Sequence, residues 1–404
     1  MGFFDFLFRR KPTPEKFAAI FMDYAKKHGF AQKMVFVPDQ FQIRIEGDAS
    51  HVLNLHNAYH DYCQAPRSRH DELLMKYTAS LSLPQIAPTF ALAKAHLMPS
   101  VRGRGQVEYI RLMTQMQDDA SPFEDLSQAF SDDAVVMLVY DTEHSIATLL
   151  PGQLQDWGVD VPTAMAVALD NLRDRTSDRF TDLGDGVVMG EWGDAFDTAR
   201  ILLPDLAYRA NVGSDPVMMI PTRGCFLLTA GNNALGQRKM VALANESIDN
   251  DGRFVSSGMY AIRDGKVVAC QPQDEEAARL LGQLQRHSLS GDYHSQQELL
   301  DKLHQSKQLD IFVPTYQLLE NKADQRLTSC CTWVKGVDSL LPKTDWVALV
   351  IPNDDPEKVV TKMLTWADVM AIGGNLLEEV EGYPVRYRVK GFPPEDKLAQ
   401  AKEV

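Results

Sequence analysis

Arginines and aspartates in the middle of the chain have the types and spacing that suit a small anion or an ion pair. Asp194, Asp197 and Arg200 fall at three-residue intervals, which brings acids and a cation together on consecutive helical turns. Arg102 stands in a stretch rich in glycine and arginine, where backbone N–H groups can approach an oxyanion closely. Arg223 completes this candidate anion or ion-pair site. We expect Arg102 or Arg200 to pair with Asp197 or with another nearby acid.

Catalytic motifs do not accompany these residues. The sequence contains no Gly-x-Ser-x-Gly, His-Glu-x-x-His or Cys-x-x-Cys motif and no P-loop. A dinucleotide-binding loop is disfavoured as well, because a third glycine is missing and Pro99 argues against the strand that should precede it. We therefore interpret 101–105 as a mobile basic loop and the Asp194–Arg200 spacing as a structural ion pair, and we predict no catalytic residue and no cofactor.

Four of the ten histidines fall within twenty residues, at His51, His56, His60 and His70. His56 and His60 have the i, i+4 spacing that places two imidazoles on one face of a helix. A metal site needs a third ligand, and Asp61 is one residue away from that face. We therefore predict no metal site and interpret the histidines as surface or half-buried side chains.

The first eleven residues combine apolar side chains with a basic cluster. The apolar arc of a helix would consist of Phe3, Phe4, Phe6, Leu7 and Phe8, and the basic cluster of Arg9, Arg10 and Lys11. An apolar face with adjacent cations is typical of a short helix that lies in an anionic membrane surface. Docking on the protein's own surface and docking in the groove of a partner are the two alternatives. The sequence thus predicts a weak contact made by residues 2–11.

Composition excludes several classes of protein. The chain has 404 residues, of which 45% are hydrophobic and 24% are charged, as in globular domains. Its 41 basic and 55 acidic residues give a net charge of −14, which argues against a general nucleic-acid-binding surface. The five cysteines match no zinc or disulfide pattern, which favours a reducing compartment. The longest strongly apolar run, Ala134–Tyr140, is too short to span a membrane. We predict a cytoplasmic protein, peripheral at the inner face of the membrane if residues 2–11 bind lipid.

Hydrophobic patterning predicts an α/β (α+β) fold with a mixed-sheet central domain and smaller flanking α+β units. We expect an amphipathic segment at 1–12, an N-terminal α+β region at 13–96, a central α/β domain at 97–290 and a C-terminal α+β domain at 291–404.

Local signals place the elements that would position these residues. Thr13 and Pro14 indicate the start of a helix, and Asp264-Gly265 indicates a two-residue hairpin turn. Further helices are expected at 194–210, 275–287 and 355–373, a solvated acidic loop at 115–133, and a half-buried strand at 385–389 that alternates apolar residues with Arg386 and Arg388.

Several stretches of the central segment carry a resemblance. Leu97–Arg102, Asp197–Leu202, Asp215–Pro221 and Phe226–Thr229 occur in this order. They resemble the Leu-Pro-x-Ile-Arg segment, the Asp-Ala-Ser-Arg-Ile-Leu helix and the strand–Pro–strand signature of the YtpQ-like family, a domain of unknown function in bacteria. The resemblance covers about residues 97–270 and implies a cytoplasmic α/β fold, without supplying a reaction. Gly224 and Cys225 stand where family members often carry an acidic residue, so any role of that acid would be lost here.

The sequence favours a binding or scaffolding protein whose partner is an unknown protein or small-molecule ligand. The alternative is an enzyme that acts on a small anionic substrate at Arg102, Arg200 and Arg223. A base or nucleophile near those arginines would separate the two, and the sequence identifies none.

Overall fold

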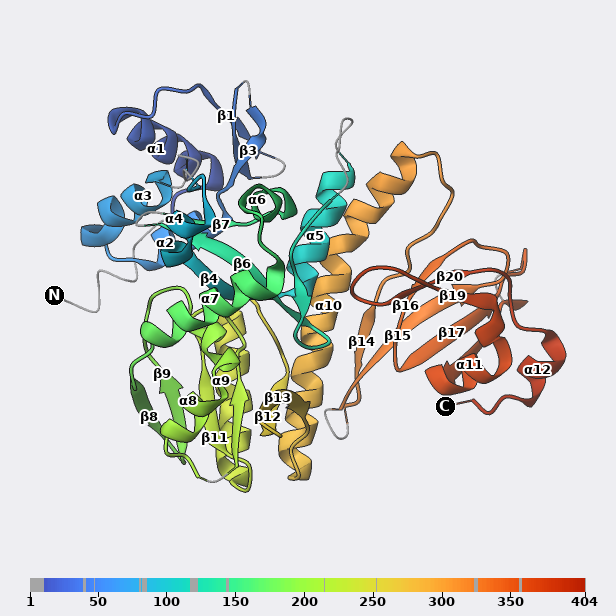
Figure 1. The fold of residues 1–404 in the computed structure, drawn as a ribbon. Coiled ribbons are helices and arrows are strands. Elements are labelled where there is room, and N and C mark those ends of the chain that lie inside the picture. The colour runs from blue at the N-terminus through green and yellow to red at the C-terminus, as the bar shows by residue number, and fades with distance from the viewer. Residues whose placement is uncertain are drawn as a thin grey trace. The chain divides into compact units, whose positions relative to one another are not determined.

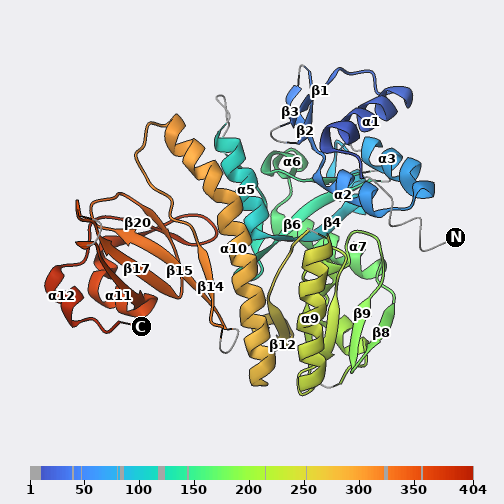
Figure 2. The same ribbon diagram turned by 180° about the vertical axis from the view of Figure 1, so that it is seen from behind.

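The computed structural model describes all residues except 1–10, 39–40, 47, 80, 82–85, 117–122, 143–144, 214, 252, 323–325, 356–357 and 404. The chain forms two compact units, and Figures 1 and 2 show its ribbon from opposite sides. Unit 1 comprises Met1–Leu97, Val139–Thr148 and Asp156–Val159, and unit 2 comprises Met98–Leu138, Leu149–Gln155 and Asp160–Val404. The predicted α+β class is confirmed, since helices alternate with mixed and antiparallel sheets throughout.

Unit 1 packs helices against a small antiparallel sheet. The sheet has the order β1 (Met34–Val37), β2 (Gln42–Ile45) and β3 (Asp48–Asn54). The helical segments are α1 (Pro14–Lys27), α2 (His56–Gln64), η3 (Arg67–Arg69), α3 (His70–Ala79), α4 (Phe90–Ala93) and η4 (Lys94–His96). The hydroxyl of Thr13 accepts a hydrogen bond from the backbone N–H of Lys16 at 3.3 Å, so the predicted helix start is confirmed. Phe17, Phe21 and Ile43 are fully buried in the core of this unit.

The largest sheet of unit 2 has six antiparallel strands. Their order is β13 (Lys266–Cys270), β12 (Met259–Arg263), β10 (Pro216–Met219), β11 (Leu227–Ala230), β9 (Val187–Gly190) and β8 (Phe180–Gly184). Asp264 and Gly265 both have positive φ, at 50° and 72°, as the predicted hairpin turn requires. Two helices, α9 (Ala234–Asp251) and α10 (Glu275–Ser306), cover the sheet through buried residues such as Met240 and Leu281.

A second sheet precedes this one along the chain. It has the order β4 (Leu97–Gly103), β6 (Ala134–Asp141) and β5 (Gln128–Ala129), and β7 (Ile146–Thr148) pairs with the end of β6. The helical segments around it in sequence are α5 (Arg104–Gln115), α6 (Pro151–Trp157), α7 (Val161–Asp174), η5 (Thr198–Leu202) and α8 (Pro204–Arg209).

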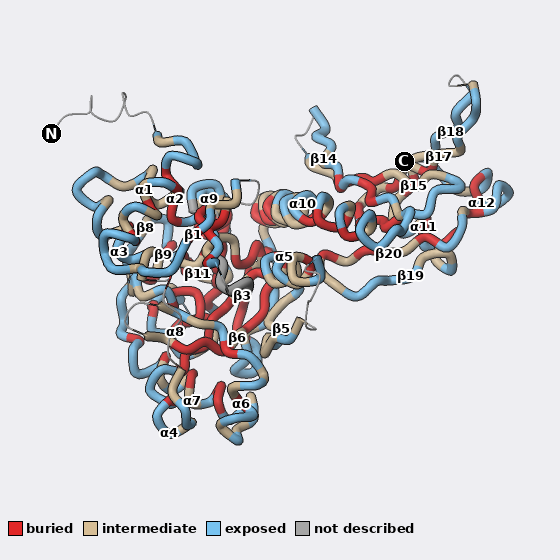
Figure 3. The backbone as a smooth tube through the Cα atoms, turned by 90° about the horizontal axis from the view of Figure 1, so that it is seen from above, coloured by how far each residue is buried: buried red, intermediate tan, exposed pale blue. Residues whose placement is uncertain are grey.

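The C-terminal part of unit 2 contains two more sheets. One has the order β14 (Gln317–Glu320), β15 (Leu327–Val334), β17 (Trp346–Ile351) and β18 (Val360–Thr365), and the other β16 (Leu340–Pro342), β20 (Arg386–Val389) and β19 (Leu377–Val380). The helical segments are α11 (Trp366–Gly373), η7 (Gly374–Leu376) and α12 (Glu395–Gln400). Buried residues mark α10 and the β15–β17 pair in Figure 3.

Helices α5 and α10 lie side by side in Figures 1 and 2. Leu112 of α5 packs in one buried cluster with Leu300 and Leu303 of α10 and with Leu340 of β16. This cluster packs α5 and α10 against the sheet that contains β16, so it brings together Leu112 and Leu340, which are 340 − 112 = 228 residues apart in sequence.

Two predictions near the candidate arginines are wrong. Residues 97–103 form strand β4 despite Pro99, because β4 lies at the end of its sheet, where a missing N–H is tolerated. Gly103 then caps α5, so the expected mobile loop at 101–105 is a strand–helix junction. The helix expected at 194–210, in which Pro204 indicates a kink or two pieces, consists of two pieces: the short segment η5 and then α8, which Pro204 starts at its first turn.

Three further boundaries differ from the prediction. Helix α10 continues to Ser306 instead of ending at His287, because its second half buries Tyr293 and Leu299. It therefore runs without a break through residue 290, the boundary expected between the last two domains. The helix expected at 355–373 is strand β18 followed by α11, whose N-cap is Thr365. The acidic 115–133 segment includes the end of α5 and strand β5, so it is not one solvated loop.

The predicted contact segment falls outside the described part of the chain. Phe3, Phe4, Phe6, Leu7, Phe8, Arg9 and Arg10 all belong to the residues that are not described. Within the described ranges, no helix combines the length and the apolar composition that crossing a bilayer requires.

Candidate functional site

Arg200, one of the predicted site residues, lies in a closed structural network. Its guanidinium is fully buried and forms a bidentate ion pair with Asp194, with Nη1–Oδ1 and Nη2–Oδ2 distances of 2.8 and 2.7 Å. Its Nε donates to the hydroxyl of Thr176 at 3.1 Å, and its plane lies 4.3 Å from the ring of Trp192. Burial raises the pKa of Asp194, but the paired Arg200 holds that pKa below its ordinary value.

Asp197 does not pair with Arg200. Its Oδ1 accepts the backbone N–H groups of Trp192 and Gly193, both at 3.0 Å, and so fixes the turn before η5. The acid that neutralises Arg200 is Asp194, which the sequence also singled out. Every nitrogen of the Arg200 guanidinium donates to an oxygen. The pairing of Arg200 with Asp194 is therefore explained by a structural role, and no ligand is needed to account for it.

Arg102 and Arg223 lie near each other but in a different part of unit 2. Nη1 of Arg102 donates to the carbonyl oxygen of Val101 at 3.0 Å, and Nη2 of Arg223 donates to Oε1 of Gln106 at 3.2 Å. Burial and, to a smaller extent, the positive charge of Arg223 together lower the pKa of Arg102 to about 9. The structure thus brings these two predicted residues together and places Asp197 and Arg200 in a separate network.

The histidines of unit 1 have ring contacts. His56 lies edge-on to Phe41 with ring centroids 5.1 Å apart, and burial lowers its pKa. The ring centroids of His70 and Tyr62 lie 3.8 Å apart, with the two rings tilted by 31°. His56 and His60 line a cavity of about 540 Å³, and the side chain of His51 lies outside the described residues. In the described part of the chain, no group of three or more His, Cys, Asp or Glu side chains could hold a metal ion.

A second buried arginine, Arg386 on β20, has a different environment. Only 6% of it is exposed, yet neither Nε nor Nη1 has a hydrogen-bond partner among the described residues. We call these two nitrogens the open edge of Arg386; their N–H groups point in different directions, because the N–H of Nε lies next to Nη2 and Nη1 lies next to Cδ. Its Nη2 makes a long contact of 3.4 Å with the carbonyl oxygen of Tyr293, and the guanidinium lies 4.7 Å from the ring of that tyrosine. Burial lowers the pKa of Arg386 to about 10.

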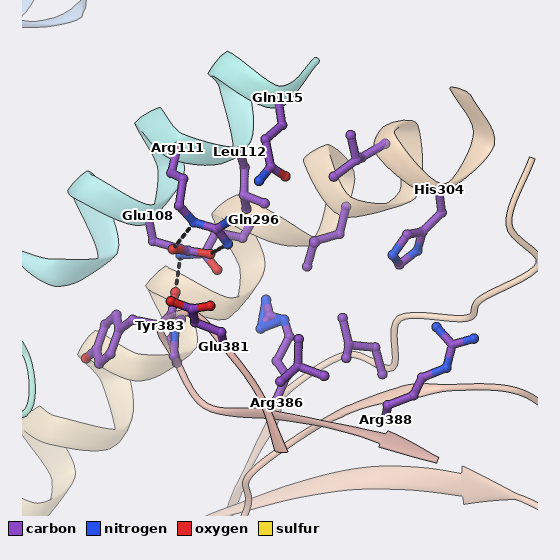
Figure 4. A pocket seen from close by; sticks show the side chains of 16 residues that line it. Glu108, Arg111, Leu112, Gln115, Gln296, His304, Glu381, Tyr383, Arg386 and Arg388 are labelled. Atoms are coloured by element: carbon purple, nitrogen blue, oxygen red, sulfur yellow. Dashed lines mark hydrogen bonds and ion pairs between the residues drawn. The ribbon is translucent and has the colours of Figure 1, made fainter. Parts of the chain in front are cut away.

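Arg386 lines a cavity of about 270 Å³ within unit 2, shown in Figure 4. The walls come from one face of α5, one face of α10, strand β16 and the β19–β20 hairpin. The lining residues are Glu108, Arg111, Leu112, Gln115, Gln296, Leu300, Leu303, His304, Leu340, Val380, Glu381, Gly382, Tyr383, Pro384, Arg386 and Arg388. Helical spacing explains the wall of α5, since its four lining residues fall at i, i+3, i+4 and i+7.

Most other polar groups of this cavity are already paired. Nε and Nη2 of Arg111 donate to Oε2 and Oε1 of Glu108, at 2.8 and 2.5 Å. This hydrogen bonding raises the pKa of Arg111. Nε2 of Gln296 donates to the carbonyl oxygen of Tyr383 at 3.0 Å. Arg388 forms an ion pair with Asp338. Glu381 also lines the cavity, and its charge contributes to the raised pKa of Arg111. Arg386 is therefore the lining arginine that has no carboxylate partner in the described chain.

The carboxyl group of Asp292 lies close enough to Arg386 for its charge to raise the pKa of that arginine. Its Oδ2 is sealed from solvent and lacks a hydrogen-bond partner in the ranges that the structure describes. Burial raises the pKa of Asp292 to about 7, with the charge of Asp133 adding to the effect and that of Arg386 opposing it. A Cβ on Gly105 would lie 2.0 Å from Oδ1 of Asp292, so only glycine allows α5 this close to the carboxyl group.

Sequence reasoning missed this cavity. It predicted the strand of Arg386 and Arg388 but placed both side chains on its more polar face, whereas Arg386 is buried beneath α10. One signal was available: two arginines at i, i+2 point to the same face of a strand, where their mutual repulsion needs an explanation.

Comparisons with protein-family models, with curated proteins and with solved structures find no match to this chain. The resemblance to the YtpQ-like family is therefore still a prediction. Function has to be argued from the chemistry of the cavity.

Proposed function

We propose that this chain is a binding protein for a small organic anion, whose acid group is held by the guanidinium of Arg386. The observation that carries the proposal is Arg386, which lines the cavity, is only 6% exposed, and has no hydrogen-bond acceptor in the described chain for Nε and Nη1. A buried donor without an acceptor is destabilising, and a carboxylate or phosphate oxygen that accepts from this guanidinium would offset part of that cost.

The size and lining of the cavity support a ligand of metabolite size. About 270 Å³ is near the lower end of the range for small-molecule sites, and Leu112, Leu300, Leu303 and Leu340 supply an apolar wall. A net charge of −14 repels anions from most of the surface, and the cavity is lined by three arginines, Arg111, Arg386 and Arg388, and two glutamates, Glu108 and Glu381. The guanidinium of Arg386 is thus a local positive charge that suits one small anion and not a bulk polyanion.

Binding is favoured over catalysis by the side chains that line the cavity. Among the described residues, the lining contains no serine, threonine, cysteine or lysine, and its Glu108 is paired with Arg111. The nucleophiles or bases that it does contain are Glu381, His304 and Tyr383. The alternative, an enzyme using Arg102, Arg200 and Arg223, is disfavoured because Arg200 belongs to a separate, saturated network. We also propose a cytoplasmic location, with residues 2–11 as a weak contact to an anionic membrane, on the composition and the N-terminal pattern alone.

Titration with hexanoate tests the proposal, since this probe joins a carboxylate to an apolar chain. Isothermal titration calorimetry of the full chain should detect hexanoate binding, no binding of hexylammonium at the same ionic strength, and loss of hexanoate binding in Arg386→Met. Arg102→Gln is the matched control, because it removes another buried arginine that does not line the cavity, and it should bind hexanoate as the unaltered chain does. Binding that survives Arg386→Met, or no binding to the unaltered chain, contradicts the proposal.

A further inference from the structure

The imidazole of His304 offers a hydrogen-bond acceptor to the same cavity. Its Nδ1 lies 3.2 Å from the carbonyl oxygen of Ile311, and because a carbonyl only accepts, Nδ1 carries the proton. Burial lowers the pKa of His304 and the charge of Arg388 lowers it further, so the ring is neutral at pH 7. A neutral ring protonated on Nδ1 has a lone pair on Nε2, and Figure 4 shows the ring directed into the cavity.

Charges near His304 favour a neutral donor over an ion. Arg388 lines the cavity beside His304, so a ligand ammonium there would be repelled. The charge of Arg388 is already offset by its ion pair with Asp338. A second carboxylate on the ligand would therefore gain little attraction from Arg388 and would be repelled by the lone pair on Nε2 of His304. A hydroxyl group avoids both penalties, because it donates to Nε2 and carries no charge.

The two polar ends are separated by an apolar stretch. Figure 4 shows Gln296 and the Glu108–Arg111 pair at one end of the cavity, with the Arg386 guanidinium reaching toward Gln296, and His304 with Arg388 at the other end. Gln296 and His304 are eight residues apart on α10, which corresponds to about 12 Å along the helix axis. An extended six-carbon acid with a hydrogen bond at each end spans a similar length, roughly 12 Å.

We propose that the cavity selects a short hydroxy acid, with its carboxylate at the guanidinium of Arg386, its chain along the leucine wall and its terminal hydroxyl donating to Nε2 of His304. This inference rests on the proposed function, since it assigns the second end of the same site. His304 acts here as a specificity-determining residue and Arg386 as the anchor.

A comparison of 6-hydroxyhexanoate with hexanoate tests the inference on the full chain. The two probes differ only by the hydroxyl group, and 6-aminohexanoate and adipate replace it with an ammonium and a second carboxylate. Calorimetric titration should show 6-hydroxyhexanoate binding about tenfold more tightly than hexanoate, the effect of one net hydrogen bond. The other two probes should bind no better than hexanoate. His304→Phe should abolish the preference and keep hexanoate binding, whereas His304→Gln, which retains an acceptor oxygen, should keep part of it.

The outcomes separate this inference from the function on which it rests. Hexanoate binding that depends on Arg386, without any gain from the hydroxyl group, overturns the role of His304 and leaves the anion site standing. A preference that persists in His304→Phe also overturns it, as does tighter binding of adipate or 6-aminohexanoate. Absence of binding by all four probes overturns both proposals. The four probes on the unaltered chain decide the question even if a variant fails to fold.

Discussion

Replacement of Arg386 by methionine should stabilise the protein in the absence of ligand. Burial lowers the pKa of Arg386 from 12.5 to about 10, which corresponds to a penalty of about 3 kcal/mol for burying the charge. Arginine stays protonated in proteins, so this penalty is borne by the folded state. Stacking of the guanidinium on the ring of Tyr293 offsets about 1–2 kcal/mol of it. Methionine fills a similar volume without charge, so Arg386→Met should raise the free energy of unfolding by about 1–2 kcal/mol.

Two matched substitutions provide the controls. Arg200→Met removes a fully buried arginine whose ion pair and hydrogen bonds are complete, and should lower the free energy of unfolding by about 3–5 kcal/mol. Arg111→Met makes the same change in charge inside the cavity of Arg386 but leaves Glu108 unpaired, with only 11% of that side chain exposed. It should lower the free energy of unfolding by about 1–3 kcal/mol.

The assay is urea unfolding followed by circular dichroism. The free energy of unfolding is extrapolated from the unfolding transition whose midpoint these substitutions shift. The measurement should be made at pH 6, where Asp292, with a pKa of about 7, is mostly neutral. The loss of the positive charge of Arg386 then does not destabilise a carboxylate at position 292. Loss of 1 kcal/mol or more in Arg386→Met would refute the reasoning. It would show that the guanidinium supports the fold as Arg200 does, and that the cavity needs no ligand to explain it.

Three more predictions concern Asp292, its neighbour Gly105 and the N-terminal segment. Because burial raises the folded-state pKa of Asp292 to about 7, above its unfolded value, the folded state binds more protons between pH 4 and pH 7, and stability falls as pH rises through that window. Asp292→Asn should remove this loss, so urea titration should find it more stable than the unaltered chain by about 2–4 kcal/mol at pH 8, with the difference shrinking toward pH 5. Gly105→Ala should lower the urea midpoint, by about 1–3 kcal/mol in free energy, because its Cβ would overlap the carboxyl group of Asp292, and Asp292→Ala should rescue much of that loss. Deletion of residues 2–11 should reduce flotation with anionic vesicles at low salt, and equal flotation of both chains would exclude lipid as their contact.

Local signals predicted those elements whose ends are set by a few adjacent residues. Thr13 caps α1 through its own hydroxyl, and the turn at Asp264-Gly265 needs positive φ at two positions that these residues tolerate. Both are decided within four residues, so no knowledge of the rest of the chain is required.

Elements decided by packing were predicted less well. A helix start signal at Asp355 was overridden, because residues 360–365 pair with β17 and complete a sheet. Ser288 and Gly291 weaken the helical pattern of α10, yet the helix continues because Tyr293 and later leucines are buried beyond them. Such decisions depend on partners that are distant in sequence, so local propensity cannot make them.

The candidate site shows the same division. Asp194 and Arg200 are six residues apart, and the sequence could propose their ion pair. Arg386 contacts Tyr293, and its cavity also needs Glu108 and His304 from other elements. Nothing in the sequence near Arg386 indicates that α5 and α10 will cover it. The burial of Arg386 results from the packing of the two helices against the β19–β20 hairpin, which are far apart in sequence.

The contrast between Arg200 and Arg386 carries the functional argument. Both are buried in unit 2, but folding supplies acceptors for the whole guanidinium of Arg200 and, within the described chain, for neither nitrogen of the open edge of Arg386. Stability alone would favour methionine at position 386. The guanidinium is nevertheless held in one orientation by Tyr293 and is already stripped of water, so an incoming anion needs little further ordering or desolvation of this group. The free energy that folding loses at Arg386 is therefore available to bind an anion, which is why the substitution that stabilises the empty protein is the one expected to abolish binding.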